Sequence, residues 1–199
     1  MCDAIRRAIV LSMKKPFRTL LLAAFLPLLP GSASAAPPVA SVASVDLERY
    51  AGRWFEIASF PMYFQRRCIG DTTAEYALKP DGEVTVTNRC RTESGFDQAQ
   101  GNAWAPEPGN NARLKVSFFW PFRSDYWVIG LDPDYRWAVV GNPDRKYLWI
   151  LSRTADLPKA LLEEALKAAV KQGYDLGQLS YTPHGTAVKG AGGPQTDTK

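Results

Sequence analysis

The sequence predicts an all-β fold, an eight-stranded antiparallel up-and-down β-barrel with one C-terminal α-helix packed outside it. Eight short strand-like runs follow one another, turn sequences join them, and helical periodicity begins only after the last run. An open meander would expose two sheet edges, and closure removes both. A closed barrel of eight strands can hold one small ligand or be filled by its own side chains. The runs span residues 54–60, 72–78, 83–91, 97–104, 112–119, 126–131, 136–140 and 147–153.

Turn-forming residues fill most of the connections between these runs. Lys79-Pro80-Asp81-Gly82 combines the fixed φ of proline with the freedom of glycine, and Pro108-Gly109-Asn110-Asn111, Asp132-Pro133-Asp134 and Asn142-Pro143-Asp144 are similar. Short connections place consecutive strands side by side and antiparallel. Residues 61–70 form a longer connection, which we expect to be a rim loop or a lid.

One amphipathic helix is expected after the last strand. Asp156 is positioned to cap it, Pro158 belongs to its first turn, and Gly173 ends it. The helix has an apolar stripe, which favours packing of the helix on the sheet over binding to a membrane surface. A short strand over residues 178–182 could follow. The apolar stripe consists of Leu157, Leu161, Leu162, Ala165, Leu166, Ala169 and Val170.

Residues 1–35 have the pattern of a signal peptide. A basic region at Lys14, Lys15 and Arg18 precedes an apolar run over residues 20–29, and Ala33-Ser34-Ala35 supplies the small-residue cleavage site. The apolar run is too short to favour a membrane-spanning helix. We therefore expect cleavage near Ala35 and a periplasmic or secreted protein, with either Met1 or Met13 as its start.

The expected mature chain consists of a flexible lead-in (36–44), a barrel domain (45–184) and a disordered tail (185–199). The leader carries five basic side chains and one acidic side chain, so the totals of 24 and 20 fall to 19 of each. A mature net charge near zero does not support a nucleic-acid partner. The absence of a cysteine between Cys2 and Cys68 argues against a lipid anchor.

Cys68 and Cys90 are predicted to form a disulfide. They are an even pair in an oxidising compartment. If Leu78 faces Glu83, Cys68 lies near the level of residue 93, and a bend or bulge before the strand would close the gap of three residues. A nucleophilic thiol is less favoured, because His184 is the one histidine of the chain.

Three spaced motifs then resemble the lipocalins, and most closely the bacterial lipocalins related to apolipoprotein D. The first is Gly52-Arg53-Trp54 within DLERYAGRWFEIASFP, the second is LDPDYRWAVVG with Asp132 and Tyr135, and the third is YLWILSRT with Arg153. The similarity covers nearly all of residues 45–182. It implies a barrel whose narrow end is closed by Trp54, with Arg153 lying across the indole in a cation–π contact.

The resemblance also implies a small hydrophobic ligand, here a fatty acid or lysophospholipid, carried in the cell envelope and serving membrane maintenance. An aromatic group around Phe119 and Phe122 is expected at one barrel end, close to Tyr126 and Trp127. Arg123 could bind a charged head group there, although a solvated turn arginine is nearly as well supported. Arg66 and Arg67 are second candidates for that role.

The last strand supplies the main expected acyl-chain contact. Alternation places Tyr147, Trp149 and Leu151 on one face and Leu148 and Ile150 on the other. The first face is the candidate interior, so Trp149 is the residue expected to contact ligand, with core packing as its alternative.

Catalysis is not expected. The sequence has no Ser/His/Asp arrangement, no metal-ligand spacing and no phosphate loop, so we predict no catalytic residue, no metal and no cofactor. An inward Glu56 would more readily anchor a hydrogen-bond network than a reaction. The alternatives are a lipocalin-type enzyme, such as an isomerase or de-epoxidase, and a tetrapyrrole carrier. The sequence is compatible with a homodimer and with transient membrane contact.

Overall fold

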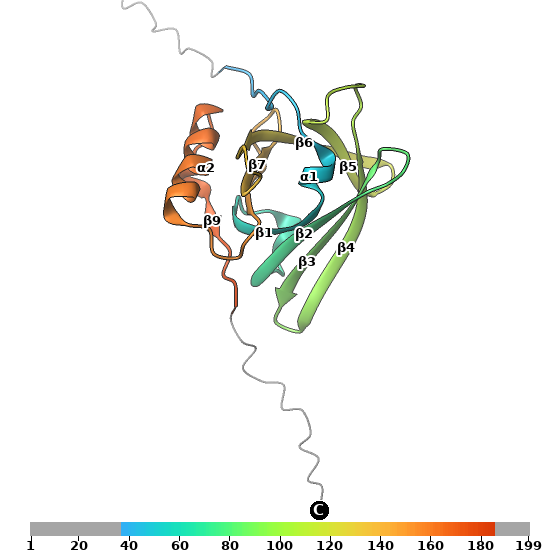
Figure 1. Cartoon of the computed structure of the whole chain (residues 1–199). Coiled ribbons are helices and arrows are strands. Elements are labelled where there is room, and N and C mark those ends of the chain that lie inside the picture. Colours follow the sequence, from blue (N-terminus) through green and yellow to red (C-terminus); the bar gives the residue numbers. More distant parts are fainter. Residues whose placement is uncertain (1–36, 186–199) are drawn as a thin grey trace, which may run out of the picture. The chain divides into compact units, whose positions relative to one another are not determined.

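The computed structural model of the chain describes residues 37–185 (Figure 1). The predicted signal peptide and residues 186–199 of the predicted tail lie outside the described residues. One antiparallel sheet contains all the strands, in the order β2-β3-β4-β5-β6-β7-β8-β1-β9, and an additional β1–β2 pairing closes it. The strands are β1 Gly52–Ser59, β2 Gly70–Leu78, β3 Val84–Thr92, β4 Gly95–Trp104, β5 Arg113–Phe119, β6 Phe122–Leu131, β7 Trp137–Gly141, β8 Leu148–Ser152 and β9 Ser180–Tyr181.

The predicted eight-stranded barrel with one outside helix is confirmed. α2 (Lys159–Lys171) packs against the outside of β6 and β7, as Figure 1 shows. Three short helices complete the fold: α1 (Leu47–Tyr50), η1 (Tyr63–Gln65) and η2 (Leu176–Gln178). β9 pairs with the second half of β1 and adds a short ninth strand where the sequence predicted one.

The predicted start of the C-terminal helix is wrong by two residues. Pro158 is the residue before the first helical turn, and no side chain caps that turn. A proline disfavours helical backbone in the residue before it. Leu157 therefore stays outside α2, and Asp156 is too far from the first turn to cap it.

Two hydrophobic clusters lie on the two faces of the sheet. The interior cluster fills part of the barrel and contains Trp54, Val86 and Leu151, whereas the helix-side cluster contains Ile150 and Ala165. The alternation predicted for the last strand is confirmed, because Trp149 and Leu151 belong to the interior cluster and Leu148 and Ile150 to the helix-side cluster.

The segment before α1 differs from the expected flexible lead-in. Val39 and Val45 are buried in the two clusters, and the N–H of Val42 donates to the carbonyl of Val128 at 2.8 Å. Three valines in a short polar stretch supply the apolar area that attaches this segment to the barrel. The segment is packed from residue 39 onward.

The predicted disulfide between Cys68 and Cys90 is present, with a Cα–Cα distance of 5.5 Å. Leu78 faces Val84, one residue later than assumed, and a bulge between Gly70 and Thr73 shifts the start of β2. The disulfide ties the connection between β1 and β2 to β3. We refer to residues 60–69 of that connection as the lid loop.

Candidate ligand-binding site

Trp54 closes one end of the barrel. Its side chain is fully buried, and its indole N–H donates to the carbonyl of Tyr50 at 2.8 Å. The guanidinium carbon of Arg153 lies 3.9 Å from the centre of the indole ring, so the expected cation–π contact is present. Arg153 also donates to the carbonyls of Ala51 and Arg53, each at 3.0 Å. These bonds use the guanidinium in the floor of the barrel and leave it no role in binding ligand.

The turn between β6 and β7 is held by Asp132 beside this floor. Its carboxylate is 1% exposed and accepts hydrogen bonds from Arg136 Nε and Nη2, both at 2.8 Å. These bonds hold the pKa of Asp132 below its usual value despite the opposing effect of burial. Tyr135 accepts a hydrogen bond from the N–H of Asp46 at 2.9 Å, which ties the turn to α1. Asp132 and Tyr135 are thus structural residues.

Three tyrosine hydroxyls meet in the interior above the floor. The hydroxyl of Tyr126 lies 2.9 Å from that of Tyr50 and 2.7 Å from that of Tyr76. Burial raises the pKa of all three phenols above the usual value, so they stay protonated at neutral pH. Tyr126 was expected beside the aromatic turn, and the structure instead places it in this network.

The interior is open to solvent on the β3–β6 side. Ala99 is exposed although β4 alternation places it on the same face as buried Ala103. Ser124 is likewise exposed, two residues from inward-facing Tyr126. An inward-facing residue is exposed where side chains leave the interior unfilled or where its strand runs past its neighbour, as β4 does beyond β5. Solvent therefore reaches the inner face of the sheet at Ala99 and Ser124.

The exposed side coincides with a gap in the pairing between β4 and β5, which we call the seam. β4 and β5 pair at three positions, Asn102 to Trp104 of β4, so within the described residues no β5 partner exists for residues 95–100. In Figure 1, β3 and β4 extend well past the point where β5 leaves them. The unpaired stretch of β4 lies next to the β5–β6 hairpin.

The lid loop lies across the end of the barrel opposite Trp54. Gln65 Nε2 donates to the Glu56 carboxylate of β1 at 3.0 Å, and the ring of Phe64 lies 5.9 Å from that of Tyr147 beside β8. On the other side Arg67 pairs with Asp97 of β4 at 3.4 Å, and Cys68 is bonded to β3. The lid loop thus contacts β1 and the residue before β8 on one side and β3 and β4 on the other, so it covers the end of the barrel opposite Trp54, which we call the mouth.

The predicted ligand contacts form two separate groups. Tyr147 and Trp149 stack at 5.9 Å under the lid loop, with Trp149 half-buried in the interior. Phe119 and Phe122 lie at the tip of the β5–β6 hairpin, where they are 76% and 77% exposed. Among residues 37–185 no ring contact joins the hairpin to Tyr126 or Trp127, so the expected proximity is wrong. Trp127 faces outward beneath Arg113.

The hairpin tip contains a third exposed aromatic residue, Trp120, which is 79% exposed. Arg123 lies 5.9 Å from its ring, in a long cation–π contact. No carboxylate of the described chain lies within 4.0 Å of the Arg123 guanidinium, whereas Arg67 already has Asp97 as a partner. Trp120 was absent from the predicted ligand contacts, although it sits within the same aromatic run.

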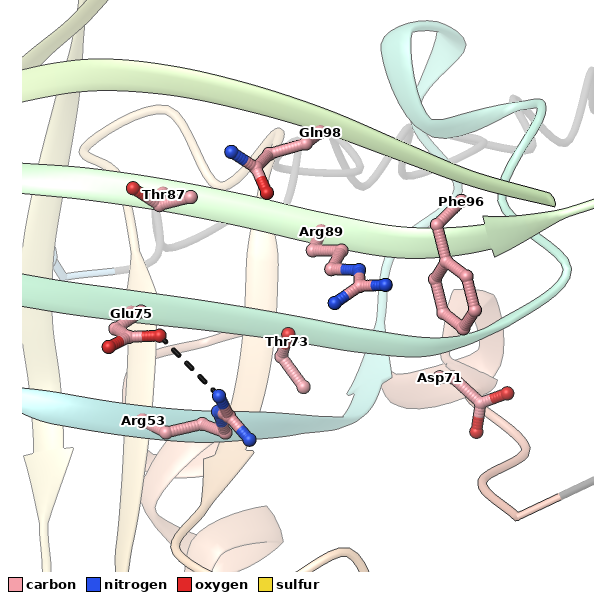
Figure 2. A pocket seen from close by; sticks show the side chains of 8 residues that line it. All are labelled: Arg53, Asp71, Thr73, Glu75, Thr87, Arg89, Phe96 and Gln98. Carbon is pink, nitrogen blue, oxygen red and sulfur yellow. Dashed lines mark ion pairs between the residues drawn. The ribbon is translucent and has the colours of Figure 1, made fainter.

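A shallow polar groove of about 240 Å³ lies on the outer face of β1 to β4 (Figure 2). Arg53 reaches toward Glu75 across it, at 3.7 Å, and Arg89 lies over the ring of Phe96. Both members of the ion pair are more than half exposed, so the pair contributes little to stability. The groove faces away from the barrel interior.

Glu56 anchors a hydrogen-bond network, as expected, but its partners Gln65 and Thr182 were not predicted. Thr182 Oγ1 donates to Glu56 at 2.6 Å, across a separation of 126 residues. His184 follows on the same segment, with Nε2 2.8 Å from the carbonyl of Glu56. We refer to residues 180–185 as the strap. Glu56 is two residues from Trp54 on β1, and this strand alternation was the one sequence feature that predicted an inward Glu56. No local sequence feature predicted that Gln65 or Thr182 would contact it.

A metal-binding cluster and a membrane-spanning helix are both absent from residues 37–185. No group of three His, Cys, Asp or Glu side chains there is arranged to hold a metal ion. None of the helices in that range is long and apolar enough to cross a membrane.

Comparisons with known proteins agree with the geometry. A family model described as a lipocalin-like domain matches residues 45–184. Temperature-induced lipocalin-1 of Arabidopsis thaliana is 42% identical, over 71% of this chain and 81% of the relative. Outer membrane lipoprotein Blc of Escherichia coli K12 is 41% identical, over 73% and 84%. The structure of insecticyanin from Manduca sexta has the same fold, with a TM-score of 0.63, 24% identity, and coverage of 76% of this chain and 87% of that one. The chain belongs to the lipocalin family.

Proposed function

We propose that this lipocalin carries a single-chain lipid, either a fatty acid or a lysophospholipid. The observation that supports this best is the exposure of inward-facing Ala99 and Ser124, which means that solvent reaches the inner face of a barrel lined by both apolar and polar side chains. Concave, mostly apolar sites with a few polar groups bind small hydrophobic molecules. It would act as a binding protein without a chemical step, in keeping with its membership of the lipocalin family.

The acyl chain would lie along the inner faces of β8 and β6. Trp149 and Tyr147 offer a stacked aromatic wall under the lid loop, and Tyr126 offers hydroxyl contacts at the lower end. Aromatic rings provide large apolar contact area with few rotatable bonds. The lid loop would have to move for the ligand to enter through the mouth, whereas the seam beside β4 offers a second route.

The β5–β6 hairpin would contact the membrane from which the lipid is taken. Phe119, Trp120 and Phe122 together expose apolar rings at one tip, and Arg123 follows them. Aromatic and cationic side chains are the residues that anchor proteins at a bilayer surface. An outer-membrane relative and the predicted signal peptide support a place in the cell envelope or in secretion.

Replacing Trp149 by alanine tests the carrier proposal. We expect the Kd for palmitate and for a lysophospholipid to rise by about tenfold or more, because the ligand loses most of an aromatic contact. Trp127→Ala is the matched control, since Trp127 is a half-buried indole on the outward face. Equal Kd values for both variants and the unmodified protein, measured by calorimetric titration below 20 °C, would contradict the proposed site.

A further inference from the structure

A buried carboxylate lies on the inner wall of the barrel, where an acyl chain would be bound. Glu56 is 6% exposed, and the register places it opposite Leu151 of the interior cluster. Directly opposed residues of an antiparallel pair point to the same face of the sheet. The carboxylate therefore faces the interior, one alternation above Trp54.

The hydrogen bonds to this carboxylate are incomplete. Gln65 donates to Oε2 at 3.0 Å and Thr182 donates to Oε1 at 2.6 Å. Within residues 37–185, no Lys, Arg or His nitrogen lies within 4.0 Å of either oxygen. An ionised carboxylate accepts about four hydrogen bonds, and burial without a cation is costly. The Glu56 carboxyl group is thus held by two neutral donors and has acceptor capacity left.

A second acceptor beside Glu56 has no partner at all. The other end of the Gln65 carboxamide, Oε1, is buried and receives no hydrogen bond. Nε2 of the same carboxamide bonds to Glu56, so Oε1 lies on the neighbouring side of the same group. Buried polar atoms are satisfied in nearly all folded proteins, and an exception requires an explanation. Two adjacent acceptors, one of them a carboxylate, suit a cationic group with several N–H donors.

We infer that Glu56 and Gln65 Oε1 form a subsite for the protonated primary amine of a single-chain amphiphile. This inference rests on the proposed carrier function and specifies the chemistry of its ligand. An ammonium supplies three donors and the opposite charge. A fatty-acid carboxylate brings a like charge and no donor, so its head group is held away from Glu56, toward the mouth or the seam. A long-chain amine and an ethanolamine head group share the required chemistry.

Ligands with the same chain length but different head groups distinguish the contribution of head-group charge to the affinity from the contribution of the apolar chain. Dodecylamine, dodecanol and dodecanoate are titrated into the purified protein at pH 7, below their critical micelle concentrations, by displacement of a fluorescent fatty-acid probe. The amine is protonated there because its pKa is about 10. We expect dodecylamine to bind about tenfold or more tightly than dodecanoate.

Glu56→Gln is the decisive variant, because it keeps the shape and removes the charge. It should weaken dodecylamine binding about tenfold and leave dodecanol within about threefold. Glu75→Gln, on the exposed outer face, is the control for net charge and should change neither affinity. Gln65→Met removes Oε1 while Glu56 stays, and should produce a smaller loss for dodecylamine alone.

The source of the amine is tested with lysophospholipids. A preference for lysophosphatidylethanolamine over lysophosphatidylcholine, lost in Glu56→Gln, assigns the subsite to ethanolamine lipids. A preference confined to dodecylamine assigns it to free long-chain amines. If dodecanol binds but Glu56→Gln changes no preference, the subsite is disproved and the carrier proposal stands. If none of these amphiphiles binds the unmodified protein, both proposals fail.

Discussion

Trp54→Ala is expected to destabilise the barrel by about 3–5 kcal/mol, because it leaves a cavity at the floor. The fully buried indole also loses its hydrogen bond to Tyr50 and its contact with Arg153. For a domain of this size the melting temperature should fall by about 10 °C or more. Thermal unfolding followed by circular dichroism measures the change.

The same variant should bind lipid nearly normally once folded. Arg153 and Trp54 form the floor, while the proposed acyl contacts lie higher, at Trp149. We expect a Kd per folded molecule within about threefold of the unmodified protein. Trp120→Ala is the control for stability, since an exposed indole costs about 0.5 kcal/mol or less to remove. A melting temperature for Trp54→Ala as high as that of Trp120→Ala would refute the structural role of Trp54.

Removing the three aromatic rings of the β5–β6 hairpin is expected to weaken the proposed membrane contact. In a variant carrying Phe119→Ser, Trp120→Ser and Phe122→Ser, the partition coefficient onto anionic phosphatidylglycerol vesicles should fall about tenfold or more. The reason is that each ring is about three-quarters exposed in the protein and gains apolar surroundings at the bilayer surface. Vesicle co-sedimentation measures the coefficient.

The matched control replaces exposed apolar residues on other elements, Val170 of α2 and Tyr181 of β9, by serine. This control should associate with vesicles as the unmodified protein does. An equal loss in both variants would show that association is nonspecific. Unchanged association in the hairpin variant would mean that another surface of the protein contacts the membrane.

Much of the fold was predictable because its signals are local. Alternation along β8 placed Trp149 and Leu151 inside, and the spaced motifs placed Arg153 over Trp54. The pairing of Cys68 with Cys90 followed from the β2–β3 hairpin and the oxidising compartment. The alternation and the hairpin are local features that a single sequence carries, whereas the Arg153–Trp54 contact was implied by the family resemblance.

The rest of the site depends on contacts between distant segments. The strap brings Thr182 to Glu56 across the full length of the domain, and neither residue has a local pattern that marks the contact. The backbone hydrogen bond from Val42 to Val128 also joins residues far apart in sequence, and it overturned the expected free lead-in. The seam beside Ala99 exists because β4 and β5 pair only at residues 102–104 of β4. The turn sequence between two strands does not specify how far their pairing extends.

Native mass spectrometry of the gently purified protein tests the central claim, that the barrel carries a single-chain lipid. The account predicts a population with a defined added mass that equals one fatty acid or one lysophospholipid, and predicts that this population shrinks in Trp149→Ala but not in Trp127→Ala. Added lipid should then quench the tryptophan fluorescence of the protein. A protein that never shows an added lipid mass, and whose fluorescence does not respond to lipid, would contradict the account.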